Sequence, residues 1–136
     1  MLNELRERMA AYLAMHRVGV LSVAGSEGVQ ALPVRYRSRG LEVECLVPRW
    51  ADAAYWLEAA PAALLIIESC HAAGLRWLAY WGAARPVDAP DWAALLPNWR
   101  LATPPDHIYR VFRVTPRRID LFDESKGWGE RETLEP

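Results

Sequence analysis

The sequence predicts a mainly β fold: an antiparallel barrel of about six strands in a Greek-key-type order, with a few short helices. About six short segments carry the alternating or continuously apolar pattern of strands, and brief turns separate most of them. The strict alternation of strands and helices that a doubly wound sheet requires is absent from the pattern. In addition, segments 29–38 and 41–47 can pair so that both faces of the hairpin are satisfied, which favours a closed or partly closed barrel.

The length and composition predict one domain without a polyanionic partner. A chain of 136 residues, taken as a single domain over 1–136, buries about two thirds of the surface that its unfolded form exposes. The net charge is −1, with acidic and basic residues mixed, so we expect neither nucleic acid nor a membrane as partner. The first residues are too polar for a signal peptide. Cys45 and Cys70 lack a C-x-x-C motif, which indicates free thiols. We therefore expect a cytoplasmic protein.

The first half of the chain gives a helix and three strands. Residues 3–15 are expected to form an amphipathic helix with Asn3 as its N-cap. The apolar run 17–24 predicts a buried strand, and 25–28 a turn. Strands 29–38 and 41–47 follow, joined by a two-residue loop at Arg39-Gly40. The predicted pairs are Arg37 with Glu42 and Arg35 with Glu44 on the polar face, and Tyr36 with Val43, Val34 with Cys45 and Leu32 with Val47 on the apolar face.

The second half gives short helices and the remaining strands. A helix is expected after Pro48 and ends at Pro61, because its apolar residues share one stripe. Segments 62–69 and 75–87 are predicted strands, and Gly82 in the second indicates a bulge or a close backbone approach. Residues 90–99 are expected to form a short helix that begins at Pro90. Segment 107–114 alternates as a strand and continues through 119–122, and the tail is polar.

Several kinds of active site find no support in the sequence. The histidines His16, His71 and His107 lie far apart and lack the spacing of a metal site. No serine stands in a G-x-S-x-G motif, and Cys45 falls on the apolar face of its strand. No residue is marked as a general acid or base. Because no glycine-rich phosphate loop occurs, a bound nucleotide would depend on arginines or on a helix N-terminus.

The start of the helix after Pro48 is the candidate anion site, because Arg49 precedes it and Arg35 lies one strand away. Two guanidinium groups beside exposed helix amides can hold a phosphate. The alternative is that Glu44 already neutralises Arg35 and that solvent surrounds Arg49. Five aromatic residues could line a planar cofactor, although we expect most of them to be core or dimer contacts. They are Trp50, Tyr55, Trp56, Trp77 and Trp81.

The chain as a whole resembles the pyridoxamine 5'-phosphate oxidase-like family, the flavin-binding split β-barrels. The resemblance rests on the order and spacing of the leading helix, segments 18–23, 33–36 and 46–49, the helix closed by Pro61, and segments 78–82 and 110–121. It implies a homodimer that binds flavin mononucleotide (FMN) in two grooves at the interface. It places Trp77 at the ring edge and Trp128 over the flavin from the partner chain. The residues implied at the flavin are Val34, Arg35, Val47, Arg49, Trp50, Ala51, Asp52, Trp77 and Trp128.

The chain departs from the family at the corner that holds the flavin phosphate. Members with tight flavin binding carry Ser-x-Lys or a similar hydroxyl and cation there, whereas this chain has Ala51, Asp52 and Ala53. A carboxylate repels a phosphate, and each lost charge-assisted bond weakens binding by roughly tens-fold. The chain also lacks the length and the basic C-terminal motif of the true oxidase, so we do not expect pyridoxamine phosphate as its substrate.

These observations leave two hypotheses of function. The first is an FMN-dependent oxidoreductase acting on a small molecule, in which the cofactor performs the hydride transfer and the protein orients it. The second is a non-catalytic dimeric binding module that binds FMN weakly or not at all, or that holds another planar ligand such as heme or a deazaflavin.

Overall fold

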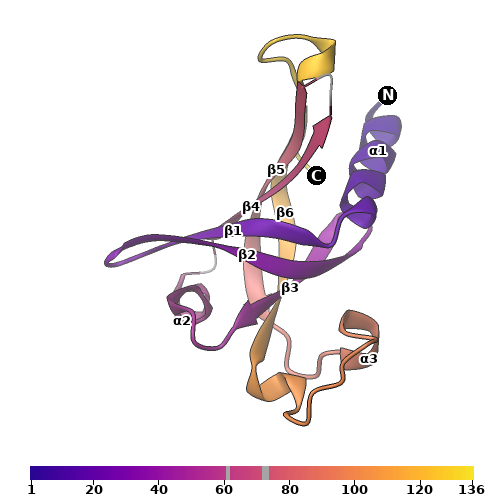
Figure 1. Cartoon of the computed structure of the whole chain (residues 1–136). Helices are drawn as coiled ribbons and strands as arrows, with labels where there is room; N and C mark the ends of the chain where they lie inside the picture. Colours follow the sequence, from indigo (N-terminus) through magenta and orange to yellow (C-terminus); the bar gives the residue numbers. More distant parts are fainter. Residues whose placement is uncertain (61, 72–73) are drawn as a thin grey trace.

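A computed structural model describes residues 1–60, 62–71 and 74–136 (Figure 1). The predicted helix end at Pro61 lies outside the described residues, as does the turn at 72–73. The elements in chain order are α1 (Leu2–Met15), β1 (Val18–Gly25), β2 (Gly28–Arg39), β3 (Glu42–Pro48), α2 (Asp52–Ala59), β4 (Ala62–His71), β5 (Gly74–Pro86), α3 (Trp92–Leu95), η1 (Pro105–His107), β6 (Tyr109–Asp123), η2 (Glu124–Lys126) and β7 (Arg131–Leu134).

The strands form one antiparallel sheet that closes on itself. Their order is β3-β2-β1-β4-β5-β6-β7, and β3 also pairs with β6, so that β1 to β6 make a barrel and β7 extends β6. The order β4-β1-β2-β3 within this sheet is the Greek-key arrangement. The mainly β, six-stranded barrel predicted from the sequence is therefore confirmed. No described helix is long and apolar enough to cross a membrane.

The barrel core contains apolar side chains from all seven strands, and α1 packs its own apolar face against β2 and β7. Two buried tyrosines fix this helix. The Tyr36 hydroxyl donates to the carbonyl of Leu13 at 2.7 Å, and the Tyr12 hydroxyl donates to the carbonyl of Ile67 at 3.0 Å. Burial raises the pKa of the Tyr36 phenol well above its usual value, so it stays a donor at neutral pH. The helix begins at Leu2 after Met1, so the predicted N-cap at Asn3 is wrong.

The β2–β3 hairpin has the predicted faces but not the predicted pairs. Its loop is Gly40-Leu41, and Arg37 stands opposite Glu44 instead of Glu42. Gly40 takes the left-handed conformation with φ of 60°, which glycine adopts at little cost. Leu41 is only 7% exposed and its carbonyl accepts a hydrogen bond of 2.6 Å from the buried Tyr80 hydroxyl, which favours this loop over the predicted one. Because the pairing moves by two residues, every side chain keeps its face.

Other elements differ from the prediction mainly in length. The helix expected at 90–99 is the single turn α3, in which Asp91 accepts a hydrogen bond from the amide of Ala94. The predicted strand 107–114 begins two residues later, at Tyr109, and continues through 119–122 as the single strand β6, while the polar tail contains η2 and β7. The bulge predicted at Gly82 is confirmed, since the β5–β6 register shifts there. A Cβ at Gly82 would lie 2.7 Å from the carbonyl oxygen of Thr115, which explains the glycine.

Candidate functional site

The predicted phosphate corner lies where β3 ends and α2 begins. The chain turns at Arg49 and Trp50, and α2 starts after its N-cap Ala51. Ala51 and Ala53 are buried, at 3% and 0% exposure, so the first turn of the helix sets its small side chains against the barrel. Asp52 is exposed and makes no side-chain cap. At this corner, therefore, position 52 faces solvent while position 53, where the family has its cation, is closed.

Gln30 on β2 belongs to this corner, although no pattern in the sequence pointed to it. Its side-chain oxygen accepts a hydrogen bond of 2.7 Å from the backbone amide of Ala53. One of the unpaired amides at the start of α2 is thereby satisfied within the protein. The contact joins residues 23 positions apart, so no local pattern could have indicated it.

Arg35 and Arg49 both lie on the outside of the barrel, and each donates only to a neutral oxygen among the described residues. Arg35 donates to the Tyr109 hydroxyl at 3.1 Å, and Arg49 donates through Nε to the carbonyl of Asp106 at 2.6 Å. The predicted pairing of Arg35 with Glu44 is wrong. The shifted register sets Arg35 opposite Leu46. The corner therefore has two positive charges that no carboxylate in the described structure neutralises.

The carboxylate of Glu44 is occupied elsewhere. It accepts a hydrogen bond of 2.9 Å from Arg113, its cross-strand neighbour on β6. This ion pair and the hairpin register together explain why Glu44 does not neutralise the positive charge of Arg35.

The other residues predicted at the flavin are spread over the molecule. Val34 and Val47 point into the core, at 3% and 0% exposure, so only their backbone borders the outside. Trp50 is 77% exposed beside the corner. Trp77 stacks on Phe122, with ring centroids 4.5 Å apart and planes within 8°.

Phe122 and Tyr109 stand near opposite ends of β6. Trp77, the neighbour of Phe122, is therefore far from the corner within one chain. Trp128 is 92% exposed between η2 and β7. Arg49, Trp50, Ala51 and Asp52 are consecutive at the corner, and Arg35 is linked to it through Tyr109, which pairs with Pro48, whereas Trp77 and Trp128 lie elsewhere.

The outer surface of the sheet at β1, β4 and β5 is apolar. Val18 and Val20 on β1 are 56% and 41% exposed, and Trp81 on β5 is 38% exposed. Val20 pairs with Ile66, and Leu64 pairs with Trp81, so these side chains are contiguous across the strands. A contiguous apolar sheet face of this kind marks an interaction surface more often than a single exposed residue does.

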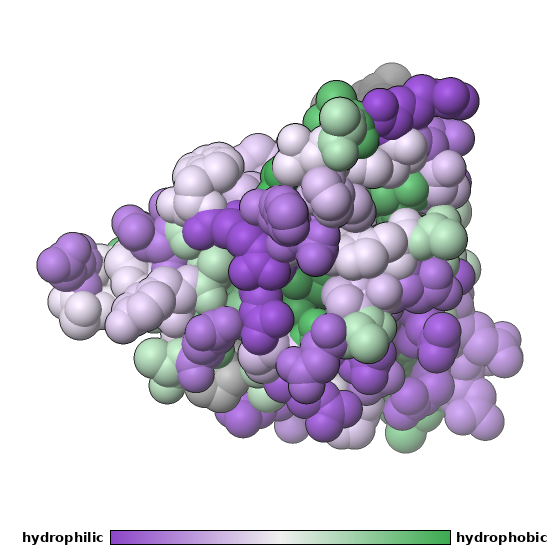
Figure 2. All heavy atoms as spheres, turned by 90° about the horizontal axis from the view of Figure 1, so that it is seen from below, coloured by the Kyte–Doolittle hydropathy of each residue, from purple (hydrophilic) through white to green (hydrophobic). Residues whose placement is uncertain are grey.

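An open groove of about 580 Å³ adjoins Arg35 on the outside of the barrel. Its walls are the start of β1, the outer side of β2, and the connection that leads from β5 to β6. Seen from the side on which α2 and α3 lie, the surface shows hydrophilic groups around a recessed apolar area (Figure 2). In the lining of the groove, Arg17 and Arg35 stand with apolar residues of the connection such as Leu96.

Groups that would favour other chemistry do not gather. Among the described residues, no three histidine, cysteine or acidic side chains lie close enough to hold a metal ion. Cys45 is fully buried, and burial raises the pKa of its thiol to about 12, which makes it a packed and unreactive cysteine. The side chain of Cys70 lies outside the described structure.

The fold and the corner define the protein as a Greek-key split barrel with a basic site on its outer side. No family model and no curated protein matches the sequence. Solved structures match the fold over nearly the whole chain. One is a protein of the pyridoxine phosphate oxidase family from Clostridium acetobutylicum, related to general stress protein 26, with a TM-score of 0.70, 10% identity, and coverage of 97% of this chain and 94% of that chain.

Two further structures have the same fold and differ in what their names say they bind. An FAD-binding protein from Mesorhizobium loti matches with a TM-score of 0.67 and 15% identity, covering 83% of this chain and 90% of that one. A heme-binding protein from Mycobacterium smegmatis matches with a TM-score of 0.69 and 20% identity, covering 96% of this chain and 56% of that one. The predicted resemblance to the pyridoxamine 5'-phosphate oxidase-like proteins is thus confirmed at the level of the fold.

Proposed function

We propose that the protein is a cytoplasmic homodimer that binds FMN at the β2–β3–α2 corner and acts as an oxidoreductase on a small molecule. The observation that carries the proposal is the pair of guanidinium groups, Arg35 and Arg49, that no carboxylate neutralises in the described structure. Arginine is the side chain best suited to grip a phosphate, since it donates through two parallel N–H groups. When bound, the flavin would supply the hydride transfer.

The chain's own residues would bind and orient the cofactor. Arg35 and Arg49 would hold the phosphate, with the exposed ring of Trp50 beside them. The missing hydroxyl and cation of the family's corner lower the expected affinity, and the carboxylate of Asp52 opposes the phosphate. Flavin binding is therefore expected to be weaker than in proteins with Ser-x-Lys at this place.

The apolar outer face supports the homodimer. Val18, Val20 and Trp81 are exposed there and lie contiguous with Leu64 and Ile66. Burial of such a face against a second copy of the chain would stabilise a dimer by about 25 cal/mol for each Å² removed from water. Val20→Lys should shift the protein from dimer to monomer in sedimentation velocity, because it sets two ammonium groups into the interface. A wild-type protein that sediments as a monomer would refute the dimer.

A second candidate is a non-catalytic dimeric module with little or no affinity for flavin, or one that binds heme. Gln30 favours it, because its side chain already occupies the amide of Ala53 at the helix start. A phosphate that used this amide would have to displace the glutamine.

The two candidates are separated by titration of the purified protein with FMN, riboflavin and heme. If the corner holds the phosphate, FMN raises the melting temperature. Riboflavin should need about a tenfold higher concentration for the same rise, because it lacks the phosphate. Arg49→Gln should abolish the preference, and Arg6→Gln, on the exposed face of α1, should not. A colourless protein whose melting temperature does not respond to excess FMN would exclude the first candidate. A response to heme alone would then support the second.

A further inference from the structure

A groove beside β2 is lined by arginines and by no carboxylate. Two hollows of about 580 Å³ and 320 Å³ lie between β2 and the connection from β5 to β6. They share Arg17, Tyr36, Leu95 and Pro97 in their linings, so they adjoin as one groove, which we call the β2 groove.

The lining of the β2 groove contains cations but no acidic residue. Arg17 and Arg35 line the larger hollow, and Arg17 and Arg37 line the smaller one. Three other hollows among the described residues each contain carboxylates, such as Glu44 at the hairpin and Glu58 beside α2. Cations that line a concave surface in this way raise the local concentration of anions.

The cations themselves are available to a ligand. The Arg17 side chain has no hydrogen bond or ion pair within the described structure, and its backbone carbonyl accepts from the amide of Tyr36 at 2.9 Å. Arg35 donates only to the Tyr109 hydroxyl. Arg17 directly precedes β1 and lies opposite Tyr36, while Val18 pairs with Arg35, and both arginines line the larger hollow. An anion in this hollow would be attracted by both guanidinium groups, and no carboxylate of the lining competes with it.

The opposite wall of the groove is apolar and contains an aromatic ring. It is formed by Leu95, Leu96, Trp99, Leu101 and Ile108. An apolar wall facing a few charged groups is the usual composition of a small-molecule site.

The ring of Trp99 is held in place. Its indole N–H donates to the carbonyl of Thr103 at 3.0 Å, and its edge contacts the Tyr109 ring at a centroid distance of 6.3 Å. Tyr109 in turn accepts the hydrogen bond from Arg35. One chain of contacts therefore joins the aromatic wall to the cations.

Both ends of the wall segment are anchored to the barrel. At its start, the amide of Val87 donates to the carbonyl of Val111 at 2.9 Å, and at its end the amide of Arg49 donates to the carbonyl of Ile108 at 2.8 Å. The groove is therefore formed before any ligand binds, which lowers the entropy lost on binding.

We infer that the β2 groove binds an amphipathic organic anion, with its carboxylate or sulfonate between Arg17 and Arg35 and its flat apolar body against the wall around Trp99. The inference does not require a flavin, because Arg17 and the apolar wall have no part in the proposed phosphate corner. The two sites share only Arg35.

The test compares two probes of the same shape and different charge, 1-pyrenebutyrate and 1-pyrenebutanol, by fluorescence titration. The carboxylate should bind about tenfold or more tightly than the alcohol, because it gains charge-assisted hydrogen bonds. Arg17→Gln should remove the difference, whereas Arg6→Gln, which changes the net charge equally, should leave it. Asn98→Asp adds a negative charge to an exposed position of the lining without removing a contact, and should also weaken carboxylate binding.

The outcomes are distinct from those of the flavin titration. Arg49→Gln should weaken FMN binding and leave pyrenebutyrate binding unchanged. Equal affinity for the two probes, or equal losses in Arg17→Gln and Arg6→Gln, would overturn the β2 groove as an anion site. If the protein does not bind FMN but still distinguishes the two probes through Arg17, the β2 groove is supported as an anion site and the proposed flavin site is refuted.

Discussion

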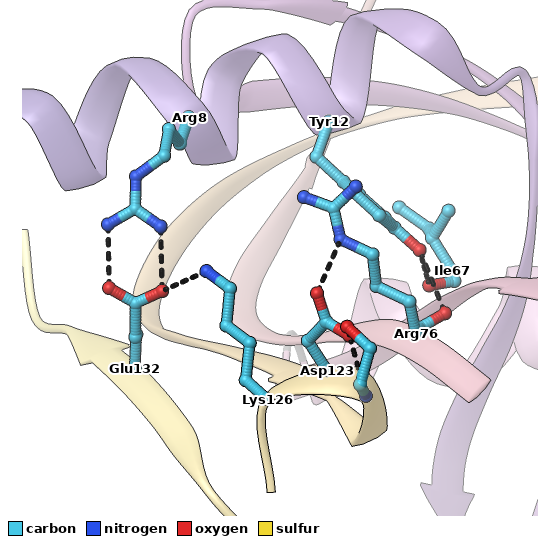
Figure 3. A network of polar contacts seen from close by, with 8 residues as sticks. Arg8, Tyr12, Ile67, Arg76, Asp123, Lys126 and Glu132 are labelled. Atoms are coloured by element: carbon cyan, nitrogen blue, oxygen red, sulfur yellow. Dashed lines mark hydrogen bonds and ion pairs between the residues drawn. The ribbon is translucent and has the colours of Figure 1, made fainter. Parts of the chain in front are cut away.

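Two hollows of similar size on this barrel differ in whether carboxylates neutralise their cations. The hollow between α1, β6 and β7, of about 540 Å³, contains cations and carboxylates that pair with one another (Figure 3). Arg8 donates two hydrogen bonds of 2.7 Å and 2.6 Å to Glu132, and Lys126 lies 4.0 Å from the same carboxylate. The β2 groove, of about 580 Å³, contains cations and no carboxylate.

The pKa values follow this difference. The hydrogen bond from Arg8 lowers the pKa of Glu132, and the same contact raises the pKa of Arg8. Hydrogen bonds from Ser125 lower the pKa of Asp123, with Arg76 adding a smaller effect. The charges of this hollow therefore stabilise the fold, while those of the β2 groove are free to stabilise a ligand. Each of the predictions below changes one side of this comparison.

The largest expected effect is on ligand binding in the β2 groove. The double change Arg17→Gln with Arg35→Gln should weaken pyrenebutyrate binding by about a hundredfold, because two charge-assisted bonds are lost. Its free energy of unfolding in urea should be unchanged or slightly higher, since two like charges are removed. Clear destabilisation would show that these arginines stabilise the fold, as the paired charges of the other hollow do, and would contradict the difference between the two hollows.

The next effect concerns stability on the paired side. Tyr12→Phe removes the hydroxyl that donates to the carbonyl of Ile67 in a buried setting. The free energy of unfolding should fall by about 1–2 kcal/mol, because a buried acceptor loses its donor. Urea denaturation measures the change, and pyrenebutyrate affinity should stay at the wild-type value. Loss of both properties would mean that the two regions are coupled.

A change at the phosphate corner tests the position that faces solvent. Asp52→Lys should tighten FMN binding by about tenfold, because it replaces a repulsive charge with an attractive one at an exposed site. Restoring a lysine at Ala53 instead would bury an ammonium group, since this residue is 0% exposed. Isothermal titration with FMN gives the affinity, and Glu7→Lys on the exposed face of α1 is a control for charge alone, because Glu7 makes no ion pair in the described structure. Equal tightening in both variants would place the phosphate elsewhere.

The smallest effect is that of the exposed ion pair. Glu132→Gln should lower the free energy of unfolding by about 0.5 kcal/mol at neutral pH, since the pair is partly exposed and screened. Because the folded pKa of Glu132 lies below its ordinary value of 4.5, this stability is present above that value and is lost as the pH falls through the folded pKa. Wild type and variant should therefore converge in acid. A difference that persists below this range would point to another cause.

The sequence predicted the parts of the fold that depend on alternation. The six-stranded barrel, the faces of the β2–β3 hairpin and the bulge at Gly82 follow from period and from turn residues. The partners across the hairpin do not, because a slip of two residues keeps every face. One contact that favours the observed register joins the Tyr80 hydroxyl to the carbonyl of Leu41, 39 positions apart in the chain.

The candidate site was predictable only in part, because contacts between residues that are distant in the sequence leave no local pattern. Arg35, Arg49 and Asp52 were selected because they are near each other in sequence or in adjacent strands. Gln30 and the β2 groove escaped prediction because they depend on segments that are distant in the sequence: Gln30 bonds to Ala53, and Arg17 lines one hollow with Leu96 and Trp99. Trp77 shows the converse. Its aromatic character suggested a ligand contact, yet in one chain its ring stacks on Phe122.

The hairpin register has a consequence for how such a site can change over evolution. In the predicted register Arg35 would face Glu44, and its charge would be neutralised, whereas in the observed register Glu44 binds Arg113 instead. The electrostatic character of the groove therefore depends on the length and anchoring of a distant two-residue loop as much as on the identity of any arginine. An insertion or deletion at Gly40-Leu41 could make a related barrel lose or acquire an anion site while its charged residues all stayed the same.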